Sequence, residues 1–390
     1  MSAIITDQLR ILNCENFVAG VASTSNSYYS WIGLPNAAEF QSDWDSNPPA
    51  PKDAFSEEND AWDTMIALKK INAADISRVV RKITWTSGTT YEMYRDDYSR
   101  SNLSPQTSST NLYDTNYYVM NQDYRVYICL QNGTNPENSN GRPSLDEPLF
   151  TDLEPRSAGG SGDGYIWKYL FTINPNNLIK FDSTSFIPLP SDWSSSTSVA
   201  AVRDNASTSG QLKIVTITNR GVGYGTAATY NNVPIEGDGS GAKCSVVVNA
   251  AGKIDSVEVT NGGSDYTFGS VNLEQVGLTN PSGSTDAGFN VIIPPQDGHG
   301  ADIYRELGAN RVLIYSRLEN DTSNPDFITG NQFARVGLVK DPYAYGSTNK
   351  LTTSKASAVY ALKLTGAGAT TTTFTTDSEI TQRIGVGSTA

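Results

Sequence analysis

Alternation of hydrophobic and polar positions is the commonest pattern along this chain, and it predicts many short strands. The clearest case covers residues 165–171. Because side chains alternate between the two faces of a strand, four aromatic rings share one face there: Tyr165, Trp167, Tyr169 and Phe171. Such a row either packs into a large core or interface or forms an exposed platform. The burial preferences of these rings favour the core or interface.

A glycine turn precedes this strand. Gly162 and Gly164 can adopt positive φ, and Asp163 suits the position between them. On the strand itself, Lys168 lies on the face opposite the rings. The segment therefore predicts a turn followed by a strand with one aromatic face.

Helical spacing clusters in the first eighty residues, and a further helical turn is predicted within residues 301–318. A first helix is predicted from a cap at Thr6 or Asp7 to about residue 19, with Gly20 ending it. Its inward residues are expected to be Leu9, Leu12 and Val18.

Residues 56–70 predict a second helix, with Ser56 as its cap. Trp62, Met65 and Ile66 recur in it at helical spacing. A third, short helix is predicted over residues 73–80.

An internal repeat stands out in the second half of the chain. Residues 215–224 match residues 257–266 at an offset of 42, each reading as a strand, a Thr-Asn-x-Gly turn and a tyrosine. Residues 242–246 match residues 287–291 at an offset of 45. Two copies are too few for a solenoid, so residues 208–298 predict a small, separate β module made by duplication.

The pattern as a whole predicts a mainly β (α+β) protein: a β-sandwich middle domain with flanking short helices and an inserted small β module. Further strands are expected over residues 26–34, 124–130, 311–315 and 333–339. Four segments follow: 1–90, which pairs with 300–390 as a discontinuous domain; the sandwich domain 91–200; the inserted module 208–298; and the C-terminal β segment 300–390.

Charge and composition exclude several functions. The net charge is −13, and no Lys/Arg-rich run occurs, which disfavours binding to nucleic acid or to anionic membranes. No apolar run reaches the ~18–20 residues that span a bilayer. The start of the chain lacks the pattern of a signal peptide, and three scattered cysteines (Cys14, Cys129 and Cys244) predict reduced thiols. A cytoplasmic place of synthesis is therefore expected.

The residues for catalysis or metal binding do not assemble. His299 is the single histidine, and its glycine neighbours predict a structural loop rather than a catalytic or metal site. The segment 237–241 lacks the Gly-Lys-Ser/Thr ending of a phosphate loop. Asp238, Asp265 and Asp286 lie in glycine turns without calcium-loop spacing. We expect no catalytic residues, no metal, no cofactor and no enzymatic activity.

The motif at residues 162–171 resembles the Gly-Asp-Gly-Tyr-Val-Trp-Glu-Tyr-Leu-Phe segment of the baseplate wedge protein 8 family of T-even-type contractile-tailed bacteriophages. Further similarities follow in the same order and cover about residues 1–195 and 305–345, while the 208–298 module has no counterpart. They lie at Tyr29–Pro35, Asn47–Pro49, Trp62–Met65, Arg81–Trp85, Tyr124–Leu130, Phe333–Leu338 and Asp341–Pro342.

The resemblance implies a structural subunit of a tail baseplate wedge. It implies a homodimer that joins other wedge subunits around the central hub, located in the virion and assembled in the host cytoplasm. The structural residues of the family motif are Gly162, Asp163, Gly164, Tyr165, Trp167, Tyr169, Phe171, Trp62 and Trp85. The main alternative is a receptor- or glycan-binding tail module, suggested by the tyrosine content and the duplicated unit. A carboxylate hydrolase is a weaker option.

Overall fold

The structure is a computed structural model that describes residues 5–33, 43, 46–47, 50, 58–97, 111–197, 199–206, 211–317, 333, 335–344 and 346–352. These residues belong to two compact units, which are Met1–Asn26 with Ile71–Arg317 and Ser27–Lys70 with Leu318–Ala390. The fold is mainly β, with 35% strand and 16% helix, as the sequence pattern predicts. The predicted pairing of 1–90 with 300–390 differs from this division, because residues 1–26 and 71–90 belong to the unit that contains residues 91–317.

Helix α1 (Asp7–Ala22) begins the first unit, and the Thr6 hydroxyl caps it by accepting from the Leu9 amide at 3.3 Å. The predicted inward face is wrong. Ile11 and Val21 are buried, whereas Leu9 and Leu12 are 43% and 47% exposed. The helix carries two apolar stripes, and the one that includes Ile11 packs against the unit.

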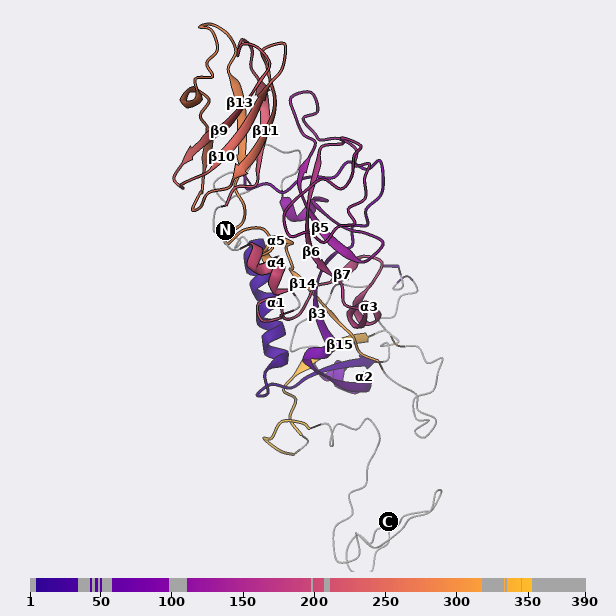
Figure 1. Ribbon diagram of the computed structural model, residues 1–390. Helices are drawn as coiled ribbons and strands as arrows, with labels where there is room; N and C mark the ends of the chain where they lie inside the picture. Colours follow the sequence, from indigo (N-terminus) through magenta and orange to yellow (C-terminus); the bar gives the residue numbers. More distant parts are fainter. Residues whose placement is uncertain are drawn as a thin grey trace, which may run out of the picture. The chain divides into compact units, whose positions relative to one another are not determined.

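Two three-stranded sheets form the body of the first unit (Figure 1). One has the order β14-β3-β7, from Arg311–Ile314, Ile76–Arg81 and Phe186–Pro188. The other has the order β4-β5-β6, from Tyr118–Met120, Arg125–Asn132 and Tyr165–Thr172. All pairs are antiparallel, and both sheets contribute buried side chains, such as Val80, Ile187 and Tyr127, to one hydrophobic core. Short helical elements connect the strands: η2 (Ala73–Asp75), η3 (Leu112–Asp114), α3 (Pro175–Phe181), α4 (Ala200–Asn205) and α5 (Ile303–Glu306).

The duplicated segment has a hydrophobic core of its own. Its strands are β8 (Ile214–Arg220), β9 (Ala228–Gly237), β10 (Lys243–Val248), β11 (Ile254–Asn261), β12 (Gly269–Val271) and β13 (Ala287–Ile292), with η4 (Glu274–Val276) between the last two. One sheet has the order β11-β10-β9-β12 and the other pairs β13 with β8. Because β8 also contacts β11, and β12 contacts β13, the two sheets adjoin along both edges (Figure 1).

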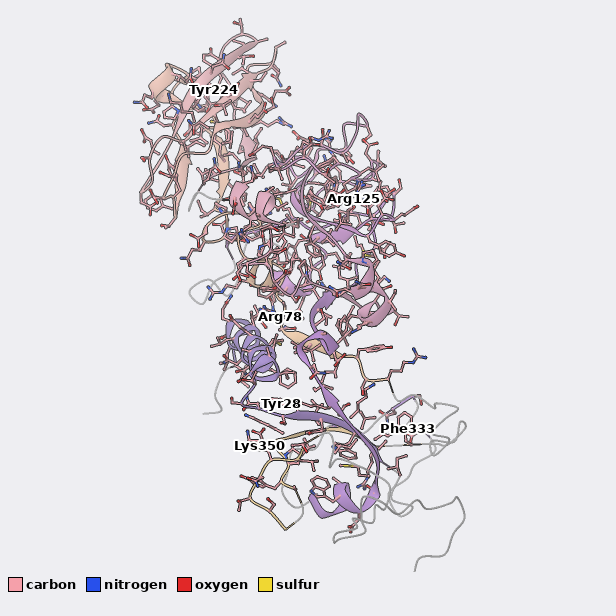
Figure 2. All side chains as sticks on the ribbon, turned by 60° about the horizontal axis from the view of Figure 1, so that its bottom comes forward. Tyr28, Arg78, Arg125, Tyr224, Phe333 and Lys350 are labelled. Atoms are coloured by element: carbon pink, nitrogen blue, oxygen red, sulfur yellow. The ribbon has the colours of Figure 1, made fainter. Side chains whose placement is uncertain are left out.

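The second unit contains helix α2 (Glu58–Thr64) and a sheet of order β15-β1-β2, from Arg335–Lys340, Tyr28–Gly33 and Met65–Ile71. Tyr29 is buried, and its hydroxyl donates to the Leu351 carbonyl at 2.9 Å. Val336 and Leu338 lie on the exposed face of β15. In Figure 2, Tyr28 and Lys350 both belong to this unit.

Two helix predictions are wrong. The chain leaves α2 at Thr64, and residues 65–71 form β2 instead of the remainder of a helix. The predicted third helix is the single turn η2 followed by β3. In both places hydrogen bonding to a neighbouring strand outweighs the helical spacing of the side chains, and β3 is rich in β-branched residues.

Candidate functional site: the aromatic strand and the base of the inserted module

The glycine turn before β6 holds the long 132–163 loop in place. Gly162 and Gly164 have φ of 70° and 86°. A Cβ on Gly164 would lie 2.8 Å from the Cα of Gly133, so only glycine allows this close approach of two backbones. The Asp163 carboxylate accepts from the Leu145 amide at 2.9 Å and from the Tyr165 amide at 3.0 Å. The turn therefore fixes both ends of the loop.

The aromatic strand is core, not a platform. Tyr165 and Trp167 are fully buried and stack with ring centroids 5.3 Å apart. The Tyr165 hydroxyl donates to the Arg142 carbonyl at 2.6 Å and accepts from the Tyr91 amide at 2.9 Å. Tyr169 is half-buried and packs edge-on against Tyr127.

A β-bulge changes the face of the fourth ring. Val126 pairs with Phe171 and Tyr127 pairs with Tyr169, so Leu170 has no opposite residue. Beyond the bulge, Phe171 leaves the face of the other rings and packs edge-on against Trp193 at 6.1 Å. The predicted four-ring stripe is therefore a three-ring stripe.

The two tryptophans outside this strand have different environments. The Trp85 indole nitrogen donates to the Ser144 hydroxyl at 3.0 Å, and its ring packs against the core of the first unit. Trp62, on α2 of the second unit, is exposed. The structure thus brings Trp85 together with the Gly162–Phe171 motif through the 132–163 loop, whereas Trp62 belongs to a different unit.

Lys168 is the buried member of a polar cluster that reaches the surface at Glu154 and that the sequence did not predict. Its side chain is 1% exposed, and its ammonium donates to the Leu153 carbonyl at 2.7 Å and to Asn205 Oδ1 at 3.0 Å. The Asn205 amide nitrogen in turn donates to Glu154 Oε1 at 2.9 Å. Burial lowers the pKa of Lys168 to about 8.

His299 lies beside this cluster, where the chain leaves the inserted module. It is buried, and its Nδ1 lies 2.6 Å from Glu306 Oε1, while Glu306 Oε2 accepts from the Gly300 amide at 2.7 Å. The Trp193 indole donates to the Gly300 carbonyl at 3.0 Å. Tyr94 packs edge-on against the imidazole at 4.7 Å. These contacts give His299 a structural position in the segment that follows β13, where the chain leaves the module.

The two copies of the repeat have the same local structure. Asn219 and Asn261 each accept, through Oδ1, from the amide two residues on. The Tyr224 hydroxyl accepts from the Ala287 amide at 2.7 Å, and the Tyr266 hydroxyl accepts from the Ala242 amide at 3.2 Å. Figure 2 places Tyr224 among the strands of the module.

The copies are also interlaced. Strand β8 of the first copy pairs with β13 of the second, and β11 of the second copy pairs with β10 of the first. Tyr224 of the first copy hydrogen-bonds to Ala287 in β13, which pairs with β8. Tyr266 of the second copy hydrogen-bonds to Ala242, next to β10, which pairs with β11. The duplication therefore makes one folding unit with approximate two-fold symmetry, not two successive lobes.

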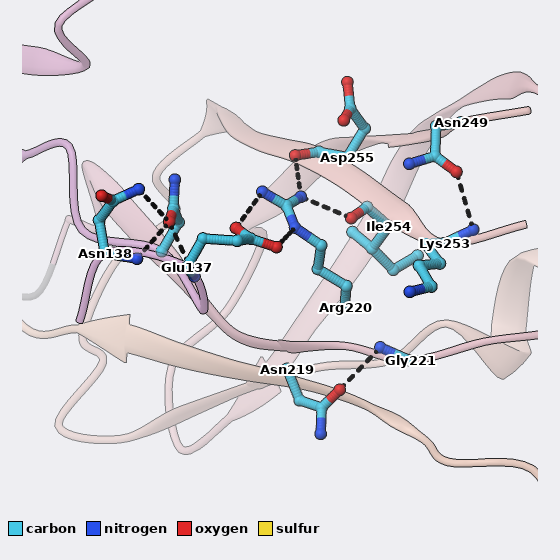
Figure 3. A network of polar contacts seen from close by, with 10 residues as sticks. Glu137, Asn138, Asn219, Arg220, Gly221, Asn249, Lys253, Ile254 and Asp255 are labelled. Atoms are coloured by element: carbon cyan, nitrogen blue, oxygen red, sulfur yellow. Dashed lines mark hydrogen bonds and ion pairs between the residues drawn. The ribbon is translucent and has the colours of Figure 1, made fainter. Parts of the chain in front are cut away.

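Two ion pairs join the module to the rest of the first unit, and both come from the first copy. Arg220 forms a two-pronged contact with Glu137, at 2.7 and 2.9 Å, and also donates to the carbonyls of Ile254 and Asp255 (Figure 3). Lys213 binds Glu154 at 2.9 Å. At an offset of 42 residues, the second copy has Gly262 in place of Arg220 and Asp255 in place of Lys213. The attachment is thus specific to the first copy.

The other candidates for chemistry remain separate. Asp238 accepts from the Thr267 hydroxyl and from the Thr267 amide at 2.8 Å. These hydrogen bonds, the hydroxyl's above all, lower its pKa to about 2 and give it a role in a turn. Among the described residues, no three His, Cys, Asp or Glu side chains lie close enough to bind a metal ion together. The helices in that part of the chain are all too short or too polar to span a bilayer.

No protein-family model matches the chain, and no curated protein matches it.

Proposed function

We propose that this chain is a structural subunit of a phage tail baseplate wedge, which forms a homodimer and joins other wedge subunits in the virion. The observation that carries the proposal is the structural role of the side chains in the motif at residues 162–171. The residues that define the motif serve packing: Asp163 and Tyr165 hold the loop by hydrogen bonds, and the Trp167 ring fills the core. Because these residues are used for packing, the motif that resembles the wedge family supports a structural role for this chain.

The outer stripe of α1 supports association with a second copy. Ile5, Leu9, Leu12, Asn16 and Ala19 are all exposed and are spaced four, three, four and three residues apart, as in one side of a coiled coil. Ile5, Leu9 and Leu12 are 57%, 43% and 47% exposed. This outer stripe carries no charge, which suits an isologous contact in which each residue near the axis faces its own kind.

A second apolar surface lies on β15. Val336 and Leu338 are exposed on a strand at the edge of its sheet. Exposed apolar residues on an edge strand favour contact with another protein. We assign this surface to a different wedge subunit, because the outer stripe of α1 already provides a contact between copies.

Co-expression with the other wedge proteins of the same phage tests the proposal. Affinity purification of the tagged full chain followed by native mass spectrometry is expected to yield complexes of fixed stoichiometry that contain two copies. A chain that stays monomeric and retains no wedge protein overturns the proposal. Ile179→Lys is a suitable surface control, because Ile179 is 82% exposed on α3, an element that carries neither apolar surface.

The two tyrosines of the repeat do not supply the exposed rings that the glycan-binding alternative requires. Tyr224 and Tyr266 are buried, and both hydroxyls hydrogen-bond to backbone groups inside the module. A glycan array that compares the full chain with a variant lacking residues 208–298 separates the two functions, since only the alternative expects binding that disappears with the deletion.

A further inference from the structure

The side chains of Lys168, Asn205 and Glu154 form a chain of hydrogen bonds in which the Asn205 amide lies between the lysine and the carboxylate. This arrangement suits a covalent reaction between lysine and asparagine. Lys168 extends from β6, Asn205 ends α4, and Glu154 lies in the segment before β6. That segment is tied to β6 by two backbone hydrogen bonds of 3.0 Å between Arg156 and Trp167. The Lys168 nitrogen lies 3.0 Å from Asn205 Oδ1, and the Asn205 amide nitrogen lies 2.9 Å from Glu154 Oε1.

The surroundings favour a neutral, nucleophilic amine. Lys168 is almost completely buried, and Gly300 lies against the end of its side chain, where an added Cβ would be 3.5 Å from Cε. Removal from water penalises the ammonium form, so the amine is neutral in an appreciable share of molecules near neutral pH. Desolvated lysines with lowered pKa are the ones that act as nucleophiles in proteins.

We propose that Lys168 and Asn205 join in an intramolecular amide bond, with Glu154 as the proton relay. The Nζ atom of Lys168 attacks Cγ of Asn205, and the new Nζ–Cγ bond forms. The Cγ–Nδ2 bond then breaks, and one proton passes from Nζ to Nδ2, so that a single ammonia molecule leaves. No oxidant, reductant or other reactant is needed.

The contacts of Glu154 fit the relay. Its Oε1 already accepts a hydrogen bond from the nitrogen that leaves. In the proposed reaction this carboxylate takes the proton from the attacking amine and passes it to that nitrogen. Lys213 holds Oε2 at 2.9 Å and thereby fixes the carboxylate. The hydrogen bond from the Asn205 amide nitrogen to Glu154 leaves the Asn205 amide oxygen directed toward Lys168. Fixed geometry of this kind supplies much of the rate of reactions between neighbouring groups.

The bond would close a loop between residues 37 positions apart and fasten helix α4, which precedes the inserted module, to strand β6. The inference rests on the geometry of three side chains and does not depend on the wedge assignment. In the absence of the reaction, the same contacts would only satisfy a buried ammonium by hydrogen bonding.

Mass spectrometry of the purified full chain tests the bond directly. After incubation at neutral and mildly alkaline pH, the intact mass is expected to fall by one ammonia, and sooner at the higher pH. A tryptic digest is expected to contain a branched peptide that joins the segment with Lys168 to the segment with Asn205. An unchanged mass with an intact, unbranched Lys168 peptide overturns the proposal.

Three variants separate this reaction from succinimide formation, which also releases ammonia at Asn-Gly sites such as Asn132-Gly133. Lys168→Arg and Asn205→Ala are expected to remove the branched peptide and the associated mass loss. Glu154→Gln is expected to slow its appearance on the order of a hundredfold, as removal of a general base does. A mass loss that persists in Lys168→Arg assigns the ammonia to succinimide and also overturns the proposal.

Discussion

Removal of a single oxygen from each repeat tyrosine measures what the two copies contribute to the module. Tyr224→Phe and Tyr266→Phe are chemically identical changes at equivalent positions. Tyr266 serves two buried groups, because its hydroxyl accepts from the Ala242 amide and donates to the Ile235 carbonyl at 2.9 Å. Tyr224 serves the amide of Ala287, which is only partly buried.

The difference in burial sets the magnitudes. A buried backbone group that loses its partner costs roughly 1–3 kcal/mol, whereas a group that water can reach loses about 1 kcal/mol or less. Tyr266→Phe leaves two such groups without a partner, with residues Ala242 and Ile235 both buried. We therefore expect Tyr266→Phe to lower the free energy of unfolding of the module by about 3 kcal/mol and Tyr224→Phe by about 1 kcal/mol.

Hydrogen exchange with mass spectrometry is the appropriate assay, because it reports the opening of the module separately from that of the rest of the chain. In Tyr266→Phe, peptides that contain Ala242 are expected to exchange much faster, while peptides from β5 and β6 keep their wild-type rates. Equal losses in the two variants, or a larger loss in Tyr224→Phe, would refute the assignment of the cost to buried backbone groups.

Three further predictions concern surfaces, charge and backbone. Leu9→Lys with Leu12→Lys is expected to shift the chain from dimer to monomer in light scattering after size exclusion, while the isoleucine control on α3 leaves the mass unchanged. The hydrogen bond from the facing guanidinium lowers the pKa of Glu137, so its stabilising effect is present above the unfolded carboxyl pKa and is lost as pH falls through the folded value. Exchange protection around Glu137 should fall on acidification in the wild type, and the fall should be smaller in Glu137→Gln. Gly164→Ala is expected to destabilise the first unit by more than about 2 kcal/mol in thermal unfolding, because both the positive φ and the neighbouring backbone oppose a Cβ. Gly162→Ala meets no neighbouring atom and should cost about 1 kcal/mol.

Local patterns predicted the parts of the fold that local interactions decide. Strand β6 and its glycine turn follow from alternation and from positive φ at glycine. The Asn-x-Gly turns of the repeat follow from the side-chain hydrogen bonds of Asn219 and Asn261. In these cases a few adjacent residues contain the whole reason for the structure.

The predictions failed where distant segments decide. Residues 65–71 have helical spacing but pair as β2 with a strand from residues 28–33. On α1, two apolar stripes compete for the core, and the sequence does not indicate that Ile11 rather than Leu9 is buried. The bulge at Leu170 arises from the register with β5, which the spacing within β6 cannot reveal. The cluster around Lys168 gave no signal because its members lie far apart along the chain.

Differences between the repeat copies indicate how the module became part of this protein. Equivalent positions keep what the fold requires, namely the asparagine turn and the buried tyrosine. They diverge at Arg220 and Lys213, whose counterparts are Gly262 and Asp255. The divergence is constrained on both sides: a Cβ on Gly262 would overlap the Leu212 carbonyl, while Arg220 reaches Glu137. Because the interlaced copies fold together, ion pairs from one copy hold the same folding unit to which the other copy belongs.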